Sequence, residues 1–188
     1  MKSSIILLTL VVIFGCNDGE RIVETPQPTS APAGFFPVTD FIKGQIAEIR
    51  TEGINPLLIS SRNGKTDSSW IKVEAFDSLF APFLQPVIDT ANFSKFFTEK
   101  SFLDQTINAF TFTYDPIAQL PDTIQLQHWD VYIDPQKNTV TRIFLLKRLG
   151  DQVTQLTWQA DKWCKIVTIT DGAKASVVKK EDMIKWDF

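Results

Sequence analysis

Hydrophobic positions recur with helical spacing in the first part of the folded chain. In FPVTDFIKGQIAEIRTEG they return every three or four residues, which predicts an amphipathic helix that stops at Gly53. PLLISSRNGKTDSSWIKVE predicts a β-hairpin, because Asn63-Gly64 is a strong turn signal between two strand-like runs. AFDSLFAPFLQP predicts a second helix limited by Pro82 and Pro86, and NFSKFFTEKSFLDQ continues its aromatic character.

From residue 108 onward the hydrophobic period changes to two, which is typical of strands. NAFTFTY alternates aromatic residues with threonine, and strand-like runs follow in the order IQLQHWDVYID, TVTRIFLLKR, QVTQLTWQA, KWCKIVTIT and ASVVKK. The sequence therefore predicts an α+β fold, with N-terminal helices and a hairpin followed by a curved antiparallel meander of five to six strands. This order is similar to the half-barrel of lipoprotein carriers and to the cone of nuclear-transport-factor-like domains, an analogy of architecture that does not fix function.

The first sixteen residues have the layout of an export signal. Lys2 precedes a ten-residue run, Ile5–Phe14, that is largely apolar. A membrane-spanning helix needs about 20 such residues, whereas the core of a signal peptide has about 7–15. The end of the run, Ile13-Phe14-Gly15-Cys16, resembles the lipobox of bacterial lipoproteins. That resemblance implies a diacylglycerol on the thiol of Cys16, cleavage between Gly15 and Cys16, and a fatty acyl group such as palmitate on the new amine.

The resemblance also predicts where the protein is anchored. Asn17 follows the cysteine, whereas aspartate at this place retains lipoproteins at the inner membrane of some Gram-negative bacteria. We therefore expect a lipid anchor in the outer membrane, with the domain facing either the periplasm or the cell exterior. The expected organisation is a signal peptide at 1–15, the lipidated cysteine and a Pro/Thr/Ser-rich linker at 16–34, and a single α+β domain at 35–188.

Composition narrows the classes of partner. Hydrophobic residues make up 44% of the chain, including 15 Phe and 5 Trp, which is enough for a substantial core. The formal net charge is −3 and no Lys/Arg cluster occurs, which argues against a nucleic-acid partner. The single histidine argues against a His-rich metal site, and no cofactor is predicted. The expected partners are the membrane, through the anchor, and either a protein or an apolar small molecule.

Polar residues with catalytic potential are few. His128 and Asp130 lie two apart in a predicted strand, so their side chains share a face as a base and its orienting acid would. No GxSxG-type nucleophile accompanies them, so they are weak polar candidates. Asp115, Asp122, Asp130 and Asp134 are candidates for a glycosidase-type carboxylate pair, although Asp115 and Asp134 precede proline, where aspartate commonly caps a turn. We predict no catalytic residue.

The strand tryptophans and the second cysteine each allow two interpretations. Trp129, Trp158 and Trp163 either form a flat platform for a ligand or pack in the core, as large aromatic residues usually do. Cys164 is the only other thiol besides Cys16, so it is either a buried free cysteine or a link to a second chain.

Three hypotheses about function follow. The leading one is a non-enzymatic, membrane-anchored binding or assembly-accessory domain that acts through its sheet face or rim. The first alternative is a carrier that holds a lipid or another apolar ligand in a half-barrel or cone. The second alternative is an envelope hydrolase that uses acidic residues.

Overall fold

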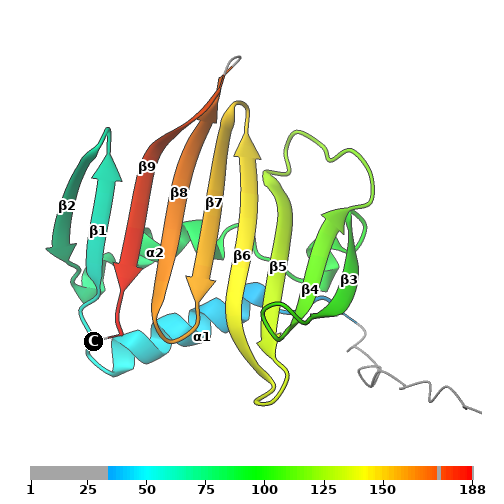
Figure 1. Cartoon of the computed structure of the whole chain (residues 1–188), viewed down its shortest axis with the longest axis horizontal. Coiled ribbons are helices and arrows are strands. Elements are labelled where there is room, and N and C mark those ends of the chain that lie inside the picture. Colours follow the sequence, from blue (N-terminus) through cyan, green and yellow to red (C-terminus); the bar gives the residue numbers. More distant parts are fainter. Residues whose placement is uncertain (1–33, 173–174, 188) are drawn as a thin grey trace, which may run out of the picture. The chain divides into compact units, whose positions relative to one another are not determined.

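The described residues form a large antiparallel sheet accompanied by a few short helices (Figure 1). The structure is a computed structural model and describes residues 34–172 and 175–187, which belong to the unit Pro32–Phe188. Gly15 and Cys16 lie outside the described residues. The helices are α1 (Val38–Thr51), the 3-10 helix η1 (Val73–Ala75), α2 (Phe76–Leu84) and α3 (Thr90–Phe93). The strands are β1 (Leu57–Arg62), β2 (Lys65–Trp70), β3 (Phe97–Asp104), β4 (Ala109–Pro116), β5 (Leu126–Asp134), β6 (Thr139–Leu149), β7 (Gln152–Gln159), β8 (Trp163–Asp171) and β9 (Ser176–Lys185).

The nine strands of the described residues all belong to one open sheet, in the order β2-β1-β9-β8-β7-β6-β5-β4-β3. The antiparallel character of the sheet is confirmed, but the expectation of five to six strands was too low. Two features explain the difference. The predicted hairpin β1–β2 joins the same sheet because β1 pairs with the last strand, β9. The aromatic segment after α2 also becomes a strand, β3, which pairs with β4 along its whole length.

Local sequence signals account for the first helix and the first hairpin. Helix α1 buries the stripe that the helical period predicts, and it is followed by Gly53 with a φ of 69°. Asn63 and Gly64 both have positive φ, 51° and 75°, as a two-residue hairpin turn with the twist of its strands requires. Helix α1 has no side-chain cap at its N-terminus. Thr39, in its first turn, instead accepts a hydrogen bond from the Ile88 backbone N–H at 2.8 Å.

Helices α1 and α2 lie against one face of the sheet, and the opposite face carries no described helix (Figure 1). Aromatic side chains fill the space between α2 and the sheet. Trp158 of β7 is fully buried and contacts Phe80 and Phe83 of α2, with ring centroids 5.5 and 5.3 Å apart. Aromatic side chains therefore fill the interior beneath α2.

Candidate functional site

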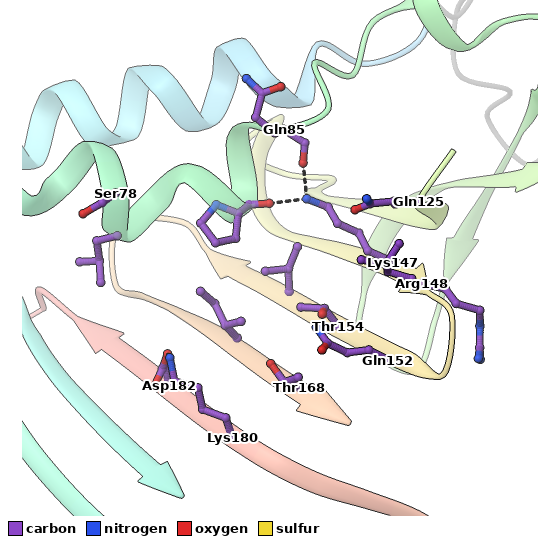
Figure 2. Close-up of a pocket in the computed structure, with 15 residues that line it drawn as sticks. Ser78, Gln85, Gln125, Lys147, Arg148, Gln152, Thr154, Thr168, Lys180 and Asp182 are labelled. Carbon is purple, nitrogen blue, oxygen red and sulfur yellow. Dashed lines mark hydrogen bonds and ion pairs between the residues drawn. The ribbon is translucent and has the colours of Figure 1, made fainter. Parts of the chain in front are cut away.

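A groove of about 510 Å³ lies between α2 and the neighbouring strands (Figure 2). We call it the α2 groove. Its helical wall comes from Ser78, Leu79 and Pro82, and strands β6 to β9 form its floor. Its remaining lining residues are Gln85, Gln125, Lys147, Arg148, Leu149, Gln152, Thr154, Leu156, Ile166, Thr168, Lys180 and Asp182. None of the described residues that line it is aromatic, although the adjoining core is rich in aromatic side chains.

The strand register explains why polar and apolar residues meet in this groove. Lys147 is paired with Thr154, Thr154 with Thr168, and Thr168 with Lys180, so these four residues form a row across β6, β7, β8 and β9. Paired residues point to the same face of a sheet, and neighbouring strands are about 4.8 Å apart. We call Lys147, Thr154, Thr168 and Lys180 the polar row.

An apolar floor adjoins the polar row on the side nearer the core. Two residues further along their strands, Leu156 is paired with Ile166 and Ile166 with Asp182. Leu156 is fully buried and Ile166 half-buried. Because side chains alternate between faces, this second row faces the same way as the polar row. The groove therefore offers an apolar floor next to hydroxyl and ammonium groups.

Lys147 closes one end of the groove. Its Nζ donates hydrogen bonds to the backbone carbonyl oxygens of Pro82 and Gln85, where α2 ends (Figure 2). The last carbonyl groups of a helix have no partner within it and carry partial negative charge, so an ammonium group is favourable there. Burial lowers the pKa of Lys147 to about 8. The lysine is therefore both a cap for α2 and a half-buried cation that faces the groove.

The other cations of the groove have carboxylate partners. Lys180 forms an ion pair with Asp182, which also accepts a hydrogen bond from Ser60 at 2.6 Å. Arg148 lies 2.9 Å from Asp171, and its side chain runs away from Lys147 in Figure 2. Within the described part of the chain, Lys147 is the one cation of this groove without a carboxylate partner.

His128 and Asp130 lie on the opposite face of the sheet, in a polar network. His128 Nδ1 lies 2.9 Å from Asp115 Oδ1, and His128 Nε2 lies 3.0 Å from Asp130 Oδ2. Thr113 donates to Asp130 at 2.7 Å, and Lys100 lies 3.1 Å from Asp115. The structure thus brings His128 and Asp130 together as their spacing predicts, and it adds a second carboxylate that the sequence did not single out as a partner.

The electrostatics of this network favour a closed ion cluster. The hydrogen bond to Asp130 is the main cause that raises the pKa of His128, and Asp115 adds to it. Burial alone would raise the pKa of Asp115 and of Asp130. Hydrogen bonds from Lys100 and His128 lower the pKa of Asp115, and hydrogen bonds from His128 and Thr113 lower that of Asp130, so both values fall below the ordinary one. A general acid of a glycosidase needs a raised carboxyl pKa, and a general base needs a free nitrogen. Here both ring nitrogens of His128 contact carboxylates.

The two remaining aspartates lie apart from this network. Asp122 is exposed in the loop before β5. Asp134 accepts hydrogen bonds from the backbone N–H groups of Gln136 and Lys137 at 2.8 and 3.1 Å, which also lowers its pKa. The turn-capping interpretation of Asp134 is therefore confirmed.

The three tryptophans do not form the platform that the sequence allowed. Trp129 and Trp158 are both 0% exposed, and Trp129 stacks on Tyr114 with ring centroids 4.5 Å apart. Trp163 is paired with Gln159, next to the pair formed by Trp158 and Cys164, so it lies on the opposite face of the sheet. The core interpretation holds for Trp129 and Trp158, whose rings have no surface to offer a ligand.

Cys164 is a free cysteine with 0% exposure. Burial raises the pKa of its thiol, which keeps the thiol protonated and unreactive. Its side chain points into the core beside Trp158, so the buried interpretation is confirmed. Among the described helices, none has the length and apolar character needed to cross a membrane.

The polar row was hard to recognise from the sequence, because its members look like ordinary strand residues. A signal was nevertheless present in the turns. A turn at Gly150 places Lys147 opposite Thr154, and a turn at Asp161 places Thr154 opposite Thr168. The turn positions do not predict where α2 lies on the sheet, and the position of α2 decides which strand residues it covers. No protein-family model matches this chain, and neither a curated protein nor a solved structure is significantly similar to it.

Proposed function

We propose that this chain is a lipid-anchored protein of the outer membrane whose folded domain binds a ligand in the α2 groove without transforming it. The anchor part of the proposal rests on the resemblance of Ile13-Phe14-Gly15-Cys16 to a lipobox. The domain part rests on the groove. A binding domain of this kind acts by holding a molecule near the membrane surface.

One observation carries the binding proposal: unpartnered polar groups and an apolar floor meet in one open groove. The side chains of Thr154, Thr168 and Gln152 form no hydrogen bond with another described residue. Ligand sites are typically concave, largely apolar and about 300–1,000 Å³ in volume, with a few polar groups that orient the ligand. The α2 groove, at about 510 Å³, falls within that range.

The carrier alternative is favoured only in the form in which the lipid lies in the α2 groove and not inside the core. The space between α2 and the sheet is filled by Phe80, Phe83 and Trp158, so a lipid would not lie inside the core. It would lie in the α2 groove, which Leu79 of the helix and Ile166 of the sheet both line. The hydrolase alternative has weaker support. Asp115 and Asp130 both contact His128, and the pKa values of both carboxyl groups are lowered, which does not suit a general acid.

The anchor is tested by metabolic labelling with palmitate. The wild-type chain should incorporate the label and fractionate with outer membranes, and a Cys16→Ser variant should lose both properties. Equal labelling or equal fractionation of the two proteins would overturn the anchor part of the proposal.

The groove is tested by photo-crosslinking in intact cells. A benzophenone amino acid at position 79, on the groove wall, should form an adduct visible as a discrete mass increase of the purified protein. The same amino acid at position 157, on the opposite face of the sheet, is the matched control. Absence of an adduct at 79, or equal adducts at both positions, would overturn the groove as the binding site.

A further inference from the structure

We propose that the polar row of the α2 groove binds the anionic headgroup of a single-chain amphiphile, whose apolar chain lies against Leu79 and Ile166. This inference rests on the proposed function, since it takes the groove to be the ligand site and names the class of ligand. The headgroup chemistry is a carboxylate or a phosphate ester.

The first argument is charge. Lys147 is half-buried, and its only described partners are the neutral carbonyl groups of Pro82 and Gln85. A buried charge without a counter-ion is costly, and an opposite charge in the groove offsets that cost. Lys180 does not supply a second free charge, because Asp182 already neutralises it. The groove therefore presents one uncompensated positive charge and suits a headgroup with a single strong negative charge.

The second argument is hydrogen bonding. Thr154 and Thr168 lie next to each other between the two lysines, on β7 and β8 (Figure 2). Their hydroxyl groups have no partner among the described residues, so they are able to donate to the oxygen atoms of an anion. Hydrogen bonds to a charged acceptor are about twice as strong as those between neutral groups. Two hydroxyl donors beside one ammonium group match the several oxygens of a carboxylate or phosphate.

The third argument is the apolar surface beside the polar row. Leu79 and Pro82 lie on one side of the groove and Leu156 and Ile166 on the other. Leu79, Pro82 and Ile166 are half-buried, so an inorganic anion would leave part of their surface facing water, whereas an alkyl chain would cover it. Leu149, 60% exposed at the β6–β7 turn, extends this surface to the mouth of the groove.

The composition of the lining distinguishes an amphiphile from a sugar. Sugar sites generally stack a ring on a flat aromatic side chain, and no Phe, Tyr or Trp is found among the described residues that line the α2 groove. The branched aliphatic side chains that are present instead offer an irregular surface, to which a flexible alkyl chain adapts.

The inference is tested by calorimetric titration of the purified full-length chain carrying Cys16→Ser. The probes are decanoate, decyl phosphate, decanol and inorganic phosphate, each below its micelle concentration. We expect one decanoate or decyl phosphate molecule per chain, bound at least about tenfold more tightly than decanol and than inorganic phosphate. The tighter of the two anionic probes identifies the headgroup as a carboxylate or a phosphate.

Variants assign the affinity to individual residues. Lys147→Gln should weaken the anionic probes by about tenfold and leave decanol unchanged. The double variant Thr154→Val/Thr168→Val keeps the shape of the row without its hydroxyl groups and should weaken the same probes, which covers the case that Lys147→Gln does not fold. Lys165→Gln, on the same strand as Thr168 but on the other face of the sheet, is the matched control and should bind like the parent chain.

Several results would overturn the inference. They are decanol binding as tightly as the anions, inorganic phosphate binding as tightly as decyl phosphate, or polar-row variants with unchanged affinity. If no probe binds while position 79 still forms an adduct in cells, the ligand class is wrong and the groove remains the binding site. If position 79 forms no adduct, the proposed function itself fails.

Discussion

His128 Nε2 and Asp130 Oδ2 lie 3.0 Å apart on one face of β5, and the opposite ring nitrogen of His128 lies 2.9 Å from Asp115 Oδ1. An imidazole held between two carboxylates is stabilised in its charged form. The network spans β4 and β5 and therefore ties two neighbouring strands together by charge as well as by backbone hydrogen bonds. Its contribution to stability must depend on pH.

The first prediction concerns that dependence. The pKa of His128 is raised above its ordinary 6.5, so its stabilisation is complete below pH 6.5 and is lost as the pH rises through the folded value. The pKa values of Asp115 and Asp130 are lowered below 3.8, so their stabilisation is present above pH 3.8 and is lost as the pH falls through the folded values. The network should therefore stabilise the fold most between these limits, near pH 5.

The test compares the wild-type chain with His128→Gln by urea denaturation from pH 4 to 9. The variant should be less stable by about 1–3 kcal/mol near pH 5, in the range for hydrogen bonds to charged groups, and the difference should shrink above neutrality. Gln155→Ala, on the same face of the sheet, is the control and should follow the wild-type profile. A constant difference at all pH values would contradict the network as described.

The second prediction compares two tryptophans at one hairpin. Trp158 is 0% exposed and contacts Phe80 and Phe83, so Trp158→Ala should cost about 3–5 kcal/mol, as for a large residue removed from a core. Trp163 lies on the opposite face and is half-buried, so Trp163→Ala should cost less than half as much. Thermal unfolding followed by circular dichroism measures both. Similar losses would show that the face without helices is as tightly packed as the core.

The third prediction concerns Thr39, which is 1% exposed and accepts a hydrogen bond from the Ile88 N–H. Thr39→Val keeps the shape and leaves the buried donor without a partner, which costs about 1–3 kcal/mol. Thr51→Val removes an exposed hydroxyl group that bonds to the Ala47 carbonyl oxygen at 2.8 Å and should be nearly neutral. Denaturant midpoints compare the two variants. Equal effects would refute a special role for Thr39 in linking α1 to the segment after α2.

The fourth prediction compares two glycines at which substitution by alanine should have opposite effects on stability. Gly64 has a φ of 75°, where any side chain is strained, so Gly64→Ala should destabilise the β1–β2 hairpin by about 1–2 kcal/mol. Gly44 lies in α1, and a Cβ there would meet nothing within 4 Å, so Gly44→Ala should stabilise the helix by about 0.5–1 kcal/mol. A lower melting temperature for Gly64→Ala and a higher one for Gly44→Ala would confirm both predictions. A shift in the same direction for both would contradict the turn geometry or the exposed helix position.

Much of the fold follows from local patterns in the chain. The apolar stripe of α1 and the Asn63-Gly64 turn predict their elements because helical period and left-handed turn residues act over a few residues only. The same holds for β4 to β8, whose period of two and turn residues set successive hairpins. Pairings between distant segments were not accessible in this way. The contact of β1 with β9 joins Ser60 to Asp182, and no local pattern encodes a partner that far along the chain.

In the candidate site, too, some features follow from local sequence patterns and others depend on contacts between distant segments. That the residues of the polar row lie on strands, and that His128 and Asp130 share a face, follows from the amino-acid pattern, because strand period and turn position are local properties. The difference between Trp158 and Thr154 could not be seen before the chain was folded. Trp158 is buried against Phe80, whereas Thr154, four residues earlier on the same strand and the same face, lines a groove. Their exposure differs because α2 covers one part of the sheet and ends before it reaches the other. The position of α2 is set by the packing of the whole core and not by the residues exposed at its margin.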